Sequence, residues 1–114
     1  MTKLWKEQRL SDEFVSHFEG FFQGCKQIVK KFYEGPNHPP ERDPVLSYDL
    51  GQRYIRVVKT SHGQRGVYCF VDTTNGDVLK AASWKVPAKH ARGNIFDESN
   101  GLKSMNWHGA AYLR

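Results

Sequence analysis

The sequence is poor in cysteine and in long apolar runs. Its 114 residues include only 2 cysteines, Cys25 and Cys69, too few for the disulfide framework of a small secreted domain. Both lie inside apolar patterns typical of buried free thiols. The apolar runs are short, and the start, MTKLWKEQRLSDE, is charged where a signal peptide is apolar. We therefore predict two core cysteines, no membrane-spanning or secretory segment, and a cytoplasmic protein.

Short catalytic motifs are also missing. The sequence has no CxxC, HExxH, GxxxxGKS/T, GxGxxG or GxSxG pattern, and such patterns position the nucleophiles, metal ligands and phosphate-binding loops of many enzymes. Its 5 histidines are scattered without the spacing of metal ligands. The sequence therefore favours a non-enzymatic protein with no catalytic residue, no metal site and no cofactor.

Composition predicts one folded domain. Apolar residues make up 39% of the chain, aromatic residues 13% and charged residues 25%, which is enough apolar surface for a core and typical of a globular protein. A chain of this length has no room for a second core of useful size. We therefore expect residues 1–114 to form a single domain.

The first half of the chain predicts a long helix. Its apolar residues recur at alternating steps of four and three, which gives one broad stripe that faces a core. Ser11 is a suitable N-cap, and Gly35 before a proline is a stop signal, so the expected helix spans about residues 12–34. Gly20 and Gly24 lower the helix propensity, and either close packing against another element or simple tolerance explains them.

The second half predicts an antiparallel sheet. After a proline-rich extended connector, GPNHPPERDPVLSYD, the runs RYIRVVKT, GVYCFVDT and DVLKAAS are rich in β-branched and aromatic residues. The fold class is therefore α+β, with the long helix packed on a small meander of three or more strands. Asn75-Gly76 is typical of a two-residue hairpin loop. The pairs expected from that loop are Tyr68 with Ser83, Phe70 with Ala81, and Val71 with Lys80.

Alternation along the central strand divides its residues between two faces. The aliphatic face around Cys69 is the natural partner of the helix, which leaves Tyr68 and Phe70 partly exposed on the other face. Two aromatic side chains beside cations such as Arg56 form a platform on which unpaired bases can stack. The alternative is that this aromatic pair forms a second buried face or a dimer surface.

The positive charge is concentrated in the middle of the chain. Residues 51–96 hold 8 Lys and Arg against 2 Asp and Glu, whereas residues 1–50 hold 7 against 8 and residues 97–114 hold 2 against 2. A basic surface attracts phosphate-rich partners, because neutralising a phosphate releases condensed counterions. A solvated face without a ligand is the simpler explanation of the same charge.

The segment SWKVPAKHARGN carries the densest group of cations. Lys85, Lys89 and Arg92 stand at helical steps of four and three, so a short helical turn between Pro87 and Gly93 would project them from one side. His90 lies among them. Such a group can hold phosphates. The alternative is a solvated basic loop whose tryptophan docks into the core.

The run GDVLKAASWKVPAKHARGNI, residues 76–95, resembles a segment of small uncharacterised proteins encoded by bacteriophages and by marine metagenomic sequence. The resemblance covers 20 of the 114 residues. It implies a viral or virus-derived protein that acts in the cytoplasm of an infected cell. It transfers no catalytic residue to this chain.

Two functions from different classes follow from the sequence. The first is a module that binds single-stranded DNA or RNA, or the phosphates of a free nucleotide. Its predicted site residues are Arg56, Tyr68, Phe70, Lys85, Lys89, His90 and Arg92. The second is a viral structural or host-interaction protein that acts through contacts with another protein or through homo-oligomerisation. No membrane partner is expected in either case.

Overall fold

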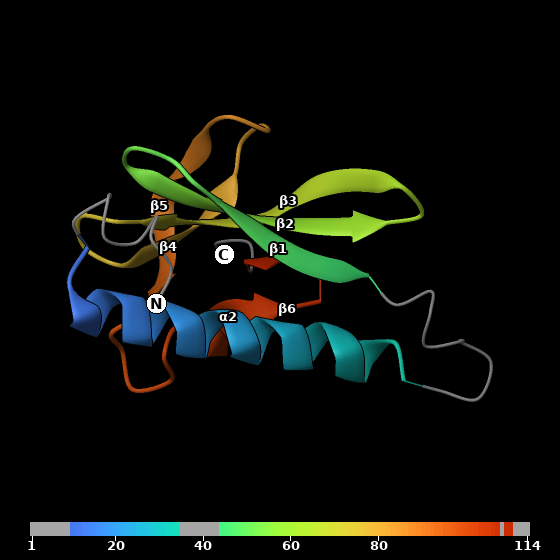
Figure 1. The fold of residues 1–114 in the computed structure, drawn as a ribbon, viewed down its shortest axis with the longest axis horizontal. Coiled ribbons are helices and arrows are strands. Elements are labelled where there is room, and N and C mark those ends of the chain that lie inside the picture. Colours follow the sequence, from blue (N-terminus) through green and yellow to red (C-terminus); the bar gives the residue numbers. More distant parts are fainter. Residues whose placement is uncertain (1–9, 35–43, 108, 111–114) are drawn as a thin grey trace.

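The helix predicted from the apolar stripe is the longest element of the computed structural model, which describes residues 10–34, 44–107 and 109–110 (Figure 1). The elements in chain order are helix α2 (Asp12–Phe32), strands β1 (Val45–Leu50), β2 (Tyr54–Ser61), β3 (Gln64–Asp72), β4 (Asp77–Ala81) and β5 (Pro87–Asn94), the 3-10 helix η2 (Leu102–Ser104), and strands β6 (Met105–Asn106) and β7 (Gly109–Ala110). Helix α2 lies along one side of a five-stranded sheet. The predicted α+β class is therefore confirmed.

Helix α2 begins as its sequence predicts. The Ser11 hydroxyl accepts a hydrogen bond from the Phe14 amide at 3.0 Å, which satisfies one of the free donors of the first turn. The helix ends at Phe32, slightly earlier than predicted. The predicted stop at Gly35 lies outside the described residues. In the part of the chain that the structure describes, no helix combines the length and apolarity needed to cross a membrane.

The five strands are antiparallel and follow one another in sequence order. The three predicted runs form β2, β3 and β4, so the meander is confirmed and is extended on both sides. Strand β1 lies in the stretch predicted as a connector, of which residues 35–43 are outside the described part. The helical turn predicted over the basic segment is wrong, because that segment forms β5. The amides of Ala82 and Ser83 donate to the Val86 carbonyl at 2.9 and 3.0 Å and close a β4–β5 hairpin, and Pro87 occupies the first strand position, which needs no donor.

The predicted register between β3 and β4 is also wrong. The observed pairs are Phe70 with Leu79 and Val71 with Val78. The strands are joined by the four residues 73–76 rather than by the two-residue loop expected at Asn75-Gly76. The Asp72 carboxylate accepts hydrogen bonds from the amide and the hydroxyl of Thr74 at 2.9 and 2.6 Å. This side chain therefore fixes a longer loop, in which Gly76 supplies the positive φ of 83°.

Asp72 makes the stability of the fold depend on pH. Burial raises the pKa of this carboxyl, but hydrogen bonds from Thr74 and Arg53 outweigh burial and lower the pKa below its usual value. A group whose pKa is lowered by folding stabilises the fold above its unfolded pKa of about 3.9, and this contribution is lost as the pH falls through the folded pKa. We expect a smaller loss of stability below about pH 4 in the Asp72→Asn variant than in the unmodified protein. Urea denaturation at a series of acidic pH values measures this difference in stability. Identical pH profiles for the variant and the unmodified protein would contradict the prediction.

The main core lies between α2 and the sheet. Cys25 and Cys69 are both 0% exposed and belong to it, so the prediction of two core cysteines is confirmed. Burial raises the pKa of Cys25 to about 12, although a hydrogen bond with Tyr68 lowers it slightly. Burial also raises the pKa of Cys69 well above its usual value. Both groups are therefore protonated, unreactive thiols at neutral pH.

Strand β3 carries a bulge at Tyr68. The pairs on either side of it are Val57 with Cys69 and Val58 with Val67. A bulge interrupts the alternation of a strand, and Tyr68 and Cys69 consequently both belong to the core that faces the helix. The Tyr68 hydroxyl donates a hydrogen bond to the Asn106 carbonyl at 2.6 Å. The predicted exposure of Tyr68 is therefore wrong.

The C-terminal part packs between and beside the larger elements. Strands β6 and β7 pair with each other and lie between α2 and the sheet in Figure 1. A Cβ atom added to Gly20 would approach the Asn100 side-chain nitrogen to 2.5 Å, and one added to Gly24 would collide with the Leu102 side chain. Close packing against another element therefore explains both helix glycines.

Candidate functional site

The sheet face turned away from α2 carries a row of cross-strand partners, which runs from β1 to β4. This row consists of Asp49, Arg56, Phe70 and Leu79. Directly opposed residues share one face of an antiparallel sheet, and the neighbouring Ile55 belongs to the core on the helix side. We call the face that carries this row the outer face. The β4–β5 hairpin curls toward it (Figure 1). Phe70 and Leu79 of this row are buried.

Trp84, at the tip of this hairpin, lies against two arginines of the outer face. The guanidinium carbon of Arg56 lies 4.2 Å from the centroid of the indole ring, and that of Arg65 lies 5.2 Å from it. Arg56 also donates a hydrogen bond to the Trp84 carbonyl at 3.2 Å. The electron-rich face of an indole attracts cations. Trp84 therefore holds two guanidinium groups near each other. The tryptophan itself remains 36% exposed to solvent.

A single carboxylate is shared by these two arginines. Asp49 accepts a hydrogen bond from Arg56 at 3.0 Å, and its second contact, with Arg65, is 3.5 Å long. Among the described residues, no other carboxylate forms an ion pair with either arginine. Two cations against one anion leave one positive charge uncompensated at this place. Because the groups are also bonded to each other, they hold a fixed arrangement before any ligand arrives.

A shallow pocket of about 250 Å³ opens beside this cluster. Its walls include Arg53, Tyr54, Arg56, Phe70 and Lys85. Arg53 binds the Asp72 carboxylate at 3.1 Å, and its guanidinium carbon lies 5.2 Å from the Tyr54 ring centroid. Lys85 is exposed and forms no ion pair with a carboxylate in the described part of the chain. Three cations and the Asp49 carboxylate therefore border one small open space.

The structure brings together three of the seven predicted site residues, because Arg56, Phe70 and Lys85 line this pocket. Lys89 and His90 are exposed on β5, and Arg92 is half-buried there with its Nε atom enclosed. The prediction that Lys85, Lys89 and Arg92 project from one side of a helical turn is wrong, because the segment from Pro87 onward is a strand. Val78 pairs with Gly93, and Ala81 pairs with Pro87. The two β4 residues are three positions apart, whereas their β5 partners are six positions apart, so three extra residues bulge out of β5.

Tyr68 and Phe70 are not available for base stacking. They are 2% and 3% exposed, respectively. The bulge turns Tyr68 inward, and the Phe70 ring lies 6.2 Å from the Tyr54 ring on the neighbouring strand. The aromatic rings that do reach the surface of the outer face are Tyr54, which is half-buried, and Trp84. Sequence analysis missed both of them. The spacing of two residues between Tyr54 and Arg56 was the available signal, since it places them on one side of β2.

These features define a small α+β protein whose sheet carries basic and aromatic side chains on the face away from its helix. The chain belongs to a family of unknown function (DUF7717), which it matches over residues 8–113. No curated protein and no solved structure matches the chain. The family therefore leaves the activity open, and a function has to be inferred from the outer face itself.

Proposed function

We propose that the outer face binds the phosphate groups of single-stranded DNA or RNA. The observation that supports this most directly is that Arg53, Arg56, Arg65 and Lys85 gather around Trp84 and the adjacent pocket. Only two described carboxylates pair with these four cations, Asp49 and Asp72. The surplus positive charge attracts a polyanion and releases its counterions on binding.

The chemistry of the side chains suits a single strand better than a duplex. Guanidinium groups bind phosphate oxygens through paired hydrogen bonds, and Lys85 adds a compact charge. Tyr54 and Trp84 can stack against bases, which are accessible only in an unpaired strand. Stacking accepts every base, so the expected binding has little sequence preference.

Salt titration tests the proposal. We expect a labelled single strand of about 20 nucleotides to bind with an affinity that falls steeply between about 50 and 200 mM salt. The Arg65→Gln/Lys85→Gln variant removes two exposed cations of the proposed site, one beside Trp84 and one at the pocket. Because each phosphate contact to a single strand contributes about 0.7 to the slope of log affinity against log salt, this variant should flatten the slope by about 1.4. Fluorescence anisotropy measures both quantities.

Helix α2 offers a matched control. The Lys26→Gln/Lys30→Gln variant also removes two exposed cations, but they lie on the other side of the sheet from the outer face. This variant should keep the salt slope of the unmodified protein. Equal losses in the two variants would show attraction by net charge alone, and an affinity insensitive to salt would exclude phosphate binding. Displacement of the strand by free adenosine monophosphate would instead assign the pocket to a nucleotide.

A further inference from the structure

The two carboxylates that pair with the cations of the outer face differ in how firmly they are held. Asp72 is buried, and its two oxygens bind both Arg53 and the loop that follows β3. The Asp49 side chain is 46% exposed, and a single oxygen, Oδ2, contacts Nη2 of Arg56 at 3.0 Å and Nη2 of Arg65 at 3.5 Å. Among the described residues, its carboxylate bonds to no other side chain. Since an exposed ion pair adds little stability, Asp49 can leave its partners at little cost, whereas Asp72 cannot.

The Asp49 oxygen bridges two guanidinium groups that come from neighbouring strands, β2 and β3. A phosphate oxygen bound by both arginines would occupy the same place, because guanidinium donors bind carboxylate and phosphate oxygens with similar geometry. Arg56 stays in position when the carboxylate leaves, since it also donates to the Trp84 carbonyl at 3.2 Å and lies against the indole ring. Carboxylate and phosphate therefore compete for one position that exists before the ligand arrives.

We propose that Asp49 is an internal competitor of the ligand: its carboxylate occupies the position of a phosphate between Arg56 and Arg65, and it turns to solvent when a strand binds. This inference rests on the proposed function of the outer face and adds to it a residue that sets the affinity. Each binding event then exchanges one anion for another, because the ion pairs of Asp49 break as those of the phosphate form. Binding is consequently weaker, and more easily reversed, than the cations of the outer face alone would make it.

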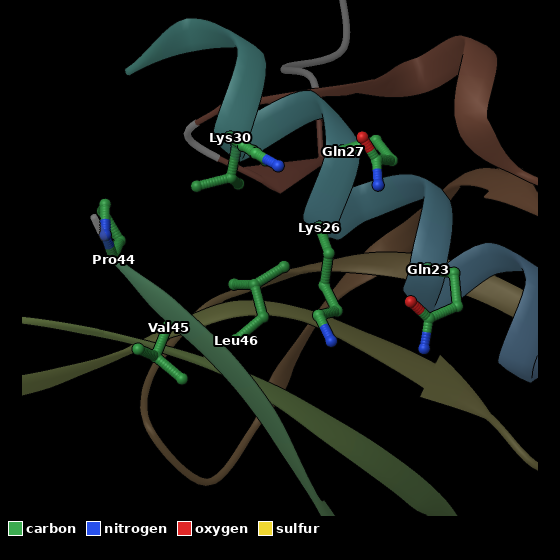
Figure 2. Close-up of a pocket in the computed structure, with 8 residues that line it drawn as sticks. Gln23, Lys26, Gln27, Lys30, Pro44, Val45 and Leu46 are labelled. Carbon is green, nitrogen blue, oxygen red and sulfur yellow. The ribbon is translucent and has the colours of Figure 1, made fainter. Parts of the chain in front are cut away.

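The lysines of helix α2 face no such competitor. Figure 2 shows Lys26 and Lys30 beside a groove between α2 and the start of β1, which Leu46 also lines. Among the described residues around this groove there is no carboxylate. A phosphate attracted to these lysines would displace no side-chain anion, so its binding would not depend on Asp49. The two lysines therefore offer a background in which the effect of Asp49 on the outer face should remain unchanged.

Removal of the Asp49 charge tests this exchange of anions. The Asp49→Asn variant keeps the size of the side chain, and we expect it to bind the labelled single strand about fivefold more tightly than the unmodified protein does. The Glu19→Gln variant removes one exposed acid from helix α2. It should change the affinity by less than about 1.5-fold, because salt screens charges across the thickness of the protein. Equal gains in the two variants would assign the effect to net charge and would overturn the proposal.

Combined variants locate the effect at the two arginines. In the Arg56→Gln/Arg65→Gln background, the gain from Asp49→Asn should disappear, because no guanidinium remains for the carboxylate to occupy. If that background does not fold, Arg65→Gln alone should reduce the gain to about twofold. In the Lys26→Gln/Lys30→Gln background, the gain should stay at about fivefold.

Fluorescence anisotropy at about 50 mM salt measures all these affinities, since the weaker variants still bind there. The same gain in every background, or no gain in a protein that does bind the strand, would overturn the role of Asp49 and leave the proposed function intact. Failure of the unmodified protein to bind the strand in a salt-dependent way would instead overturn the proposed function, and the role of Asp49 with it.

Discussion

Replacing Gly109 by alanine is expected to lower the free energy of unfolding by about 3 kcal/mol. Gly109 has a φ of 130°, a conformation that residues with a Cβ atom rarely adopt. A Cβ atom at this position would also collide with the Tyr68 carbonyl oxygen. That carbonyl belongs to the bulged residue of β3, so it cannot retreat without disturbing the pairing of β3 with β2. Strain and collision therefore act together, and urea denaturation measures their sum.

Gly63 provides the control, because it has a positive φ of 77° but no atom within 4 Å of an added Cβ. The Gly63→Ala variant should therefore lose only the backbone contribution, about 1 kcal/mol. The difference between the two variants isolates the collision with Tyr68. Equal losses would mean that β7 does not approach the β3 bulge closely, and the packing of the C-terminal part would need to be revised.

Local signals were sufficient for the helix and for the central strands. The cap at Ser11 and the apolar stripe define α2 through groups within a few residues of one another, and each of β2, β3 and β4 is a compact run of strand-forming residues. Sequence reasoning failed where a distant or unusual contact decides the conformation. The loop after Asp72 is an example, because a carboxylate that binds Thr74 overrides the turn expected at Asn75-Gly76.

Bulges account for most of the error in the candidate site. A bulge changes the face on which every following residue lies, and neither the one at Tyr68 nor those in β5 has a local sequence pattern. Tyr68 therefore lies in the core rather than on the surface. The spacing of four and three residues between Lys85, Lys89 and Arg92 would align them on a helix, but this segment forms a strand from Pro87 onward, so they do not share one side. Arg56 and Lys85, by contrast, both line the pocket of the outer face.

The cluster around Trp84 could not be derived from local sequence, because its members come from four separate segments. Asp49, Arg56 and Arg65 lie on β1, β2 and β3, and only the curvature of the β4–β5 hairpin brings the indole to them. A tryptophan followed by lysine is equally compatible with a core position and a surface position. The outer face is therefore a product of tertiary structure.

Replacing Phe18 by alanine is expected to lower the free energy of unfolding by about 4 kcal/mol, the largest effect of any variant proposed for this protein. Phe18 is 0% exposed, at the centre of the helix face that meets the sheet. Its ring lies 6.1 Å from that of Phe22 and 5.1 Å from that of Tyr48 on β1. Truncation removes these contacts and leaves a cavity that neighbours on two elements cannot fill at once.

Phe32 supplies the matched control on the same helix. It is 52% exposed and stacks on Trp107 at 4.2 Å, so the Phe32→Ala variant should lose only about 1 kcal/mol. If Phe18→Ala does not fold, the milder Phe18→Leu variant should still lose about 1.5 kcal/mol, which urea denaturation resolves. Equal losses at positions 18 and 32 would contradict the assignment of the helix face that packs on β1.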